Sequence, residues 1–104
     1  MQRRVWKARV LPGKLEEYKK RHDEIWPEMA RALRSCGITN YTIWNSGSEL
    51  IGYYECPDLK AVERCQMENE VMHKWRDSMV GIMEMEQDPD SGTVRQYRQI
   101  FELM

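Results

Sequence analysis

The 104-residue sequence predicts an α+β fold in which strands and helices follow one another in the order βαββαβ. Three patterns predict it: an alternating segment near the start, a long stretch with apolar residues every three or four positions, and two β-rich runs joined by Ser46-Gly47-Ser48. This order is the split pattern of ferredoxin-like folds, which place both helices on one face of a four-stranded antiparallel sheet. The length suits one domain that spans residues 1–104.

The first strand is expected from about Arg3 to Leu11, because its side chains alternate in character with a period of two. One face carries Trp6, Ala8 and Val10, and the other carries Val5, Lys7 and Arg9. Pro12-Gly13 then ends the strand.

A helix is expected from Leu15, where apolar and aromatic residues begin to recur at steps of three and four. These residues are Leu15, Tyr18, His22, Ile25, Trp26, Met29, Leu33 and Cys36. Pro27 removes a backbone donor inside this pattern, so we expect a kink or a restart with Pro27 in the first turn of a second segment. Tyr18, His22 and Trp26 would then share one stiff segment, and Gly37 would end the helix as a left-handed cap.

The second half of the chain is expected to form a hairpin, a second helical region and a last strand. The hairpin strands cover Ile38–Asn45 and Leu50–Cys56, which are rich in β-branched and aromatic residues. Asp58 and Asn69 are expected to cap two helical segments. The buried stripe of the later segment comprises Met72, Trp75, Met79, Ile82 and Met83. After a turn rich in aspartate, the last strand is expected to run from Thr93 to Leu103.

Both faces of the hairpin strands carry large apolar residues. In the first strand Tyr41 and Ile43 are expected opposite Ile38 and Trp44, and in the second strand Ile51 and Tyr53 are expected opposite Leu50 and Tyr54. Because the helices cover one sheet face only, the other face would be an unusually large exposed patch. We therefore expect a homodimer that packs sheet against sheet.

Composition and charge exclude several classes of protein. The 16 basic and 17 acidic residues give a net charge of −1, and the absence of a basic cluster argues against nucleic-acid binding. Three cysteines without CxxC spacing argue for a reducing compartment, and against a disulfide framework or a zinc knuckle. The chain lacks a signal-peptide pattern and a run of roughly 20 apolar residues for a membrane helix. We therefore expect a cytoplasmic protein with no membrane association.

The two histidines have different surroundings in the predicted helices. His73 has charged and polar neighbours three and four positions away, which favours a surface role. His22 has Tyr18, Ile25 and Trp26 at those positions and therefore points toward the core. One interpretation is a core histidine satisfied by a hydrogen bond. The other is a pocket in which Tyr18 and His22, one turn apart, perform general acid–base chemistry on a small hydroxylated molecule.

Other kinds of site find less support. No second inward histidine, carboxylate pair or nearby thiol accompanies His22, so no metal site is expected. The sequence has no GxSxG elbow, and the GxGxxG and P-loop patterns that bind nucleotides are absent too. Trp26 and Trp75 are interpreted as core residues, or as an indole face on which the apolar side of a sugar could stack.

The helix motif resembles the L-rhamnose mutarotase family. The motif is Tyr18-x-x-x-His22 followed by Ile25-Trp26-Pro27-Glu28, and looser matches follow at Gly37, Asn40-Tyr41, Lys74-Trp75 and the closing Ile100-Phe101-Glu102-Leu103. The likeness therefore covers nearly the whole chain.

The resemblance implies a dimeric ferredoxin-like α+β barrel, an isomerase that interconverts the α and β anomers of L-rhamnopyranose without a cofactor. It implies that His22 is the proton donor, and that Tyr18, Tyr41 and an aromatic pair beginning at Trp75 contact the sugar. The second position of that pair is Arg76 here, where relatives carry a tryptophan. Arginine can still stack and can donate hydrogen bonds to sugar hydroxyls.

The sequence therefore leads to a hypothesis for the reaction. His22 is expected to protonate the ring oxygen while Tyr18 supports the anomeric end, and Tyr41, Trp75 and Arg76 are expected to hold the sugar. Three alternatives stay open at this point. One is mutarotation of L-fucose or another aldose, one is a dimeric-barrel monooxygenase or haem-degrading enzyme, and one is a non-enzymatic binding protein with a structural His22.

Overall fold

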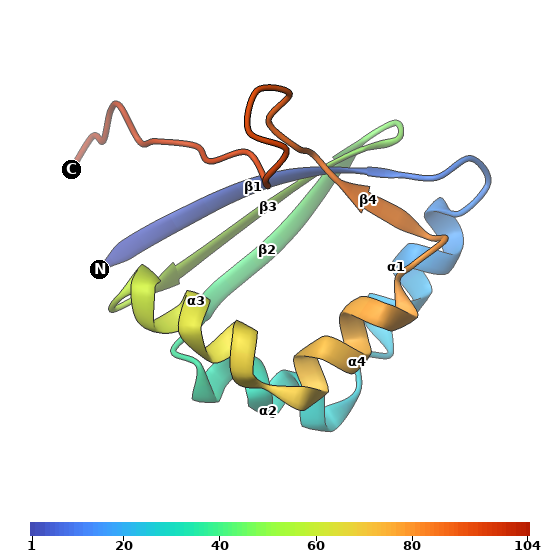
Figure 1. Cartoon of the computed structure of the whole chain (residues 1–104), viewed down its shortest axis with the longest axis horizontal. Coiled ribbons are helices and arrows are strands. Elements are labelled where there is room, and N and C mark those ends of the chain that lie inside the picture. Colours follow the sequence, from blue (N-terminus) through green and yellow to red (C-terminus); the bar gives the residue numbers. More distant parts are fainter.

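The computed structural model describes all residues from 1 to 104, and it contains four helices and one four-stranded sheet (Figure 1). In chain order the elements are β1 (Gln2–Val10), α1 (Leu15–Asp23), α2 (Pro27–Ser35), β2 (Thr39–Ser46), β3 (Glu49–Cys56), α3 (Leu59–Glu68), α4 (Glu70–Ser78) and β4 (Met83–Met85). The strands are antiparallel in the order β2-β3-β1-β4. This arrangement confirms the predicted α+β, ferredoxin-like fold.

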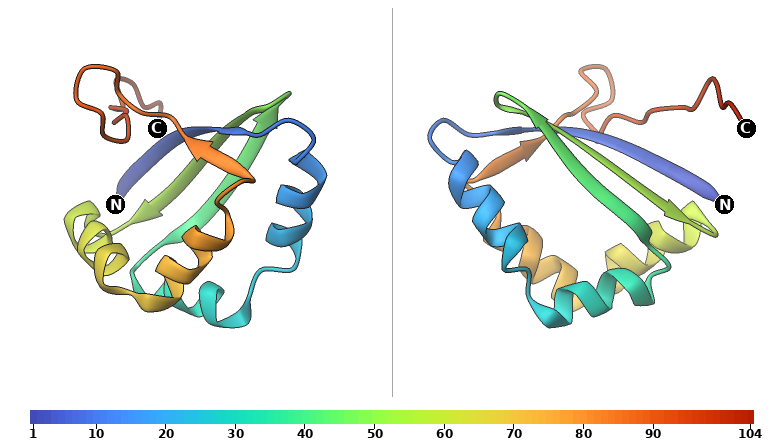
Figure 2. Two further views of the ribbon diagram at one scale, coloured as in Figure 1. Left: turned by 45° about the vertical axis from the view of Figure 1, so that its right-hand side comes forward. Right: turned by 180° about the vertical axis from the view of Figure 1, so that it is seen from behind.

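The helices lie on one face of the sheet, which we call the inner face, and the C-terminal tail lies on the opposite, outer side (Figure 2). The alternation predicted for the first strand is confirmed, since Trp6, Ala8 and Val10 are buried against the helices. The inner face of β3 contributes Leu50 and Tyr54. The core is one cluster of 15 buried residues, into which α1 contributes Tyr18, α2 Met29 and Ala32, α3 Val62 and α4 Met72.

Pro27 restarts the helix as predicted, but the break is wider than the sequence pattern indicated. α1 ends at Asp23, and Trp26 has extended backbone angles, φ −58° and ψ 133°, as the residue before α2. Proline disfavours the helical region for the residue that precedes it, so Trp26 cannot continue α1. The prediction that Tyr18, His22 and Trp26 share one stiff segment was therefore wrong, because Trp26 belongs to neither helix.

The predicted caps are confirmed. The Asp58 side chain accepts a hydrogen bond from the backbone N–H of Lys60, and the Asn69 side chain accepts one from Met72. Gly37 follows α2 with φ 91°, a left-handed conformation that glycine adopts without a steric penalty.

A β-bulge interrupts β2 and changes which residues face inward. Thr39 pairs with Glu55 while Thr42 pairs with Tyr53, so β2 contains one residue more than β3 over this stretch. Ile38 was expected on the face opposite Tyr41, but it is buried in the same core. The extra residue reverses the alternation between them, whereas Trp44 lies on the face opposite Tyr41, as predicted.

The last strand was predicted wrongly. The fourth strand is β4, and its three residues pair with Ala8, Arg9 and Val10 at the edge of β1. α4 ends at Ser78, so Ile82 and Met83 lie beyond the helix in which they were expected. The segment from Thr93 to Leu103 forms only the isolated bridge of Val94 with Gln87 and otherwise runs as an extended tail.

A disulfide joins Cys36, at the end of α2, to Cys65 in α3, with a Cα–Cα distance of 5.6 Å. The argument from cysteine spacing against a disulfide framework was therefore wrong, and the cysteine count gives no argument for a reducing compartment. The two cysteines are 29 residues apart in sequence, so the sequence gives no sign of this contact, which arises only when the fold brings the end of α2 to α3. Cys56 is the free, buried thiol. None of the helices has the length and apolar character to cross a bilayer.

Replacing both Cys36 and Cys65 by serine is expected to lower the free energy of unfolding by about 2–4 kcal/mol, because the bridge restricts the unfolded chain. Urea unfolding with and without dithiothreitol measures this. The reductant should lower the stability of the wild-type protein to that of the double variant and leave the variant unchanged. Equal stability of oxidised and reduced wild-type protein would contradict the prediction.

Candidate active site

The site begins with two residues of α1 that lie one helical turn apart. Tyr18 and His22 pack with ring centroids 4.2 Å apart and planes inclined by 34°. Tyr18 is 4% exposed and belongs to the core, whereas His22 is half-buried. The i,i+4 spacing that the sequence showed therefore places a phenol and an imidazole in direct contact.

The orientation of the His22 ring is fixed by its own helix. Nδ1 lies 2.9 Å from the carbonyl oxygen of Tyr18. A carbonyl can only accept, so Nδ1 carries the proton and donates it, and in the neutral ring Nε2 is the unprotonated nitrogen. Burial lowers the pKa of His22, although the Tyr18 carbonyl and the nearby Asp23 charge partly oppose this. His22 is therefore mainly neutral near pH 7, with Nε2 able to exchange a proton.

Two tryptophans surround the imidazole. Trp75 of α4 meets His22 edge to face at a centroid distance of 5.3 Å and meets Trp26 in the same manner at 5.1 Å. His22, Trp26 and Trp75 are each half-buried, so their rings are partly accessible from solvent. The imidazole thus sits between aromatic faces that suit the apolar side of a small ring-shaped molecule.

The sheet supplies a second phenol. Tyr41 of β2 faces the helices, packs against Tyr54 with ring centroids 5.3 Å apart, and accepts a hydrogen bond of 3.0 Å from Nε1 of Trp6. Burial raises the pKa of Tyr41, the hydrogen bond from Trp6 opposes this in part, and the nearby hydroxyls of Tyr18 and Tyr54 raise the pKa further. Burial alone raises the pKa of Tyr18 to about 12. Both phenols therefore stay protonated at physiological pH.

A polar connection holds α1 against α4. Arg21 pairs with Glu17 one turn earlier on α1 (2.8 Å) and donates to the backbone carbonyl of Ser78 at the end of α4. The Ser78 hydroxyl in turn donates to the carbonyl of Trp75 at 2.6 Å. Since His22 adjoins Arg21 and Trp75 precedes Ser78 by one turn, this connection sets the distance between the imidazole and the indole.

We call Tyr18, His22, Trp26, Tyr41 and Trp75 the aromatic cluster. It offers one imidazole nitrogen for proton transfer, two neutral hydroxyls for hydrogen bonds and indole faces for apolar contact. No three His, Cys, Asp or Glu side chains lie together in a way that could hold a metal ion. The cluster is thus equipped for acid–base chemistry on a neutral polyol.

Comparisons with known proteins agree with this description. The model of a family described as L-rhamnose mutarotase matches residues 3–103. The chain belongs to the L-rhamnose mutarotase family. A relative from Listeria monocytogenes named L-rhamnose mutarotase is 45% identical over 76 residues, which cover 71% of this chain and 72% of the relative.

Two solved structures share the fold. The crystal structure of an L-rhamnose mutarotase from Formosa agariphila matches with a TM-score of 0.79 and 26% identity over the whole of both chains. A structure described as a dimeric ferredoxin-like protein, from an uncultured marine organism, matches with a TM-score of 0.59 and 16% identity over 81% of this chain and 88% of that one. The second likeness supports the fold alone.

The structure brings together most of the residues that the L-rhamnose mutarotase resemblance singled out. Tyr18, His22 and Trp75 form one contact network, and Tyr41 faces it from the sheet. Arg76 follows Trp75 on α4 but is exposed, and so lies at the rim rather than inside the aromatic cluster.

Sequence reasoning missed Trp6 and misjudged His73. Alternation placed Trp6 on one face of the first strand, and nothing in the sequence indicates its contact with Tyr41, 35 residues away. His73 was expected to be a surface residue, but it is half-buried and its Nε2 donates to the carbonyl of Gln66 at 3.0 Å, which joins α4 to α3. Helical neighbours could not reveal this contact because it comes from the preceding helix.

An NMR titration of the His22 ring protons is expected to give a midpoint below 6.5, the ordinary histidine value. The unfolded chain then binds more protons than the folded chain between the two pKa values, so stability should fall as pH drops through 6.5 toward the folded pKa. His22→Gln should remove this part of the pH dependence of thermal unfolding. A midpoint at or above 6.5 would show that burial does not govern this ring.

Proposed function

We propose that this protein is an aldose mutarotase that interconverts the α and β anomers of L-rhamnose by general acid–base opening and closing of the sugar ring. Membership of the L-rhamnose mutarotase family supports the substrate. The observation that carries the chemistry is the contact of Tyr18 with His22, whose Nδ1 is tied to a backbone carbonyl while Nε2 is left for the substrate.

Mutarotation requires two proton transfers and one bond cleavage. The C1–O5 bond of the hemiacetal breaks, the ring oxygen O5 gains a proton and the anomeric hydroxyl loses one as C1=O1 forms. Closure on the other face of the carbonyl reverses both transfers. Neither electrons nor groups leave the sugar, so the chemistry needs no redox cofactor and no covalent intermediate on the protein.

His22 is the residue proposed to act at the ring oxygen. Its imidazolium form donates the Nε2 proton to O5 during opening, and the neutral ring accepts that proton again during closure. Burial makes the imidazolium a stronger acid than a free histidine, which favours donation to a weakly basic ether oxygen. The Tyr18 carbonyl keeps Nε2 aimed in one direction through both steps.

Tyr18 is proposed to act at the anomeric end. A phenol with a pKa of about 12 does not ionise in its resting state, so it donates a hydrogen bond to O1. It can take the anomeric proton only while it passes its own proton to the His22 ring, which has just lost one to O5, and therefore serves as a relay rather than as a base. Because the Tyr18 and His22 rings are in contact, the group proposed to act at O1 and the group proposed to act at O5 lie one helical turn apart.

Three further residues are proposed to hold the sugar. The Trp75 indole offers its face to the apolar side of the pyranose, and Tyr41 offers its hydroxyl from the opposite wall. Arg76 at the rim can donate to a sugar hydroxyl that points outward, at the position where the family resemblance implies a second indole. This difference is the reason to test L-fucose and other aldoses alongside L-rhamnose.

Exchange between the anomeric protons, measured by NMR saturation transfer over a panel of aldoses, tests the function. L-Rhamnose is expected to show the largest enhancement, and His22→Gln should lower kcat/KM about 10²–10⁴-fold, the usual contribution of general acid–base catalysis. His73→Gln changes the other histidine and should leave the rate near the wild-type value. Enhancement of no sugar would refute the proposal, and full activity of His22→Gln would refute the role of His22.

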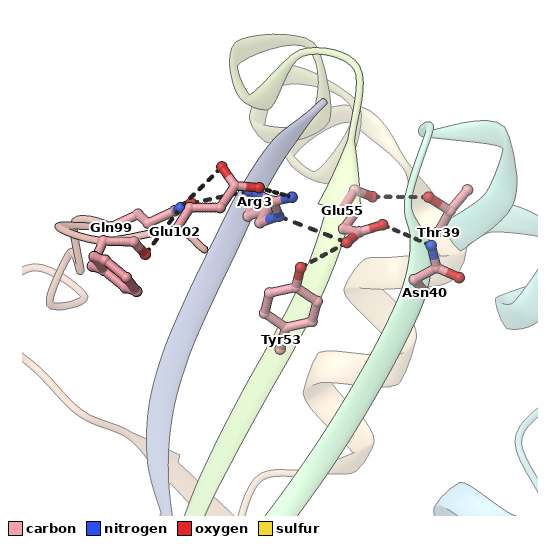
Figure 3. Close-up of polar contacts among 8 residues, drawn as sticks. Arg3, Thr39, Asn40, Tyr53, Glu55, Gln99 and Glu102 are labelled. Atoms are coloured by element: carbon pink, nitrogen blue, oxygen red, sulfur yellow. Dashed lines mark hydrogen bonds and ion pairs between the residues drawn. The ribbon is translucent and has the colours of Figure 1, made fainter. Parts of the chain in front are cut away.

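We also propose that the protein works as a homodimer in which the outer sheet faces pack together. Trp44 and Ile51 lie on this face with exposures of 67% and 38%, and Ile100 and Phe101 of the tail are 85% and 76% exposed. Arg3 anchors the tail to the sheet by hydrogen bonds to Gln99 (3.2 Å) and Glu102 (2.9 Å), as Figure 3 shows. A second copy would cover these apolar residues, which a monomer leaves in water.

A cavity beneath the tail belongs to the same surface. Its volume is about 480 Å³, and it is lined by Arg3, Val5, Tyr53, Tyr97, Arg98, Gln99 and Glu102. Its lining includes no residue of the aromatic cluster, so it belongs to the outer face of the sheet and the tail rather than to the proposed sugar site.

Light scattering after size-exclusion chromatography is expected to give twice the mass of one chain for the wild-type protein. Trp44→Glu, and separately removal of residues 100–104, should shift the population toward monomer, because each replaces or removes apolar contact area. Met67→Glu is the matched control, since Met67 is 76% exposed on α3, at the other side of the molecule. A wild-type monomer, or a dimer that only Met67→Glu disrupts, would overturn the proposed interface.

A further inference from the structure

The indole of Trp6 spans the middle strand of the sheet to reach Tyr41. Trp6 is on β1, Tyr41 is on β2, and β3 lies between them. Neighbouring strands are about 4.8 Å apart, so the two backbones are separated by about twice that distance. The indole lies across β3, and its Nε1 hydrogen bonds to the Tyr41 hydroxyl at 3.0 Å.

Gly52 makes this reach possible. Gly52 pairs with Trp6 on one side and with Ile43 on the other, so it lies directly beneath the path of the indole. A Cβ at this position would lie 1.9 Å from Cε2 and 2.2 Å from Nε1 of Trp6. Any side chain larger than hydrogen at this position would overlap the buried Trp6 indole. The indole would have to move, and such overpacking destabilises a core.

The bulge in β2 brings Tyr41 to the end of that path. The register shift falls between Thr39 and Thr42, and Asn40 has φ 49°, a left-handed conformation that asparagine tolerates better than most residues. The Asn40 side chain donates to Glu55 on β3 at 2.6 Å, which secures the irregular backbone. Bulges of this kind redirect single side chains next to functional sites.

The contact determines what the Tyr41 hydroxyl can do. A phenol oxygen donates one hydrogen and accepts at its lone pairs, whereas an indole nitrogen can only donate. Trp6 therefore occupies an acceptor position on Tyr41, and the hydroxyl hydrogen must point elsewhere. With that position taken, the hydroxyl hydrogen is free for another partner, and Tyr18 of α1 is a near neighbour of this hydroxyl.

We propose that Trp6 is a positioning residue that fixes the Tyr41 hydroxyl as a hydrogen-bond donor to the sugar, and that Gly52 is the gap through which it acts. This inference rests on the proposed function for its catalytic part, while the Trp6–Gly52–Tyr41 unit itself can be tested without substrate. Trp6 does not touch the sugar, and its effect passes through Tyr41.

The first experiment follows the indole N–H signals in a ¹⁵N-correlated NMR spectrum, with Trp6 assigned from the Trp6→Phe variant. Tyr41→Phe removes the acceptor and is expected to shift the Trp6 indole signal upfield and speed its exchange with solvent, with smaller changes at the other indoles. Gly52→Ala is expected to shift the same signal. If neither substitution moves the Trp6 indole signal, the proposed contact among Trp6, Gly52 and Tyr41 is refuted, regardless of the mutarotase activity of the variants.

The second experiment is a double-mutant cycle on mutarotase activity. Trp6→Phe alone is expected to lower kcat/KM by about five- to tenfold, the effect of losing one ordinary hydrogen bond. In the Tyr41→Phe background the same substitution should have almost no further effect, because the hydroxyl it positions is gone. An equal loss in both backgrounds would mean that Trp6 is merely structural and would overturn the proposal.

Two further variants separate positioning from loss of packing. Val10→Ala opens a cavity on the same face of the same strand, so it should lower the melting temperature without the loss of kcat/KM seen for Trp6→Phe. Gly52→Ala combined with Trp6→Phe should recover much of the thermal stability lost in Gly52→Ala, yet keep the low activity. If activity followed melting temperature across all these variants, the positioning role would be refuted. Absence of mutarotation in the wild-type protein would refute the proposed function and leave the NMR test standing.

Discussion

The register between β1 and β3 is the constraint on which the rest of the molecule depends. The two strands pair continuously from Gln2 with Cys56 to Arg9 with Glu49, and each carries one further strand on its free edge. Because side chains alternate across a sheet, a slip of one residue would turn Trp6 and Tyr54 into solvent and place charged residues under the helices. The core, the site wall that holds Tyr41 and the outer face are therefore all fixed by this single pairing.

The helix layer adds a second constraint, because Pro27 divides it into short pieces. A continuous helix from Leu15 to Ser35 would be about 30 Å long at 1.5 Å per residue and could not follow the twisted sheet closely. The break lets α1 and α2 contact different parts of the core, and it places Trp26 between them, where it meets Trp75. Arg21 then ties α1 to the end of α4, so that the imidazole and the indole come from separate helices but hold one geometry.

Local sequence patterns predicted what local physics decides. Alternation in β1, the caps at Asp58 and Asn69 and the restart at Pro27 depend on neighbours within a few residues, and each was confirmed. The last strand failed for a different reason: Thr93–Leu103 has strand-forming residues, but the segment that pairs with the end of β1 is the earlier Met83–Met85. Tertiary packing decides which segment pairs with an edge of the sheet, and it also decides that Cys36 meets Cys65. The periodicity of a sequence cannot predict which of several possible partners a segment takes.

The same limit applies to the candidate site. Tyr18 and His22 could be paired from sequence because both lie on one helix, whereas the Trp6 contact needed Gly52 and a bulge to bring β1 to Tyr41. Burial then acts in opposite directions on the groups assembled there, since it lowers the pKa of the imidazole and raises that of both phenols. The protonated His22 ring is therefore a stronger acid than a free histidine, and the two phenols are weaker acids than a free tyrosine. In the proposed mechanism the imidazole therefore gives up its proton to the ring oxygen, whereas Tyr18 releases its own proton only as it accepts another.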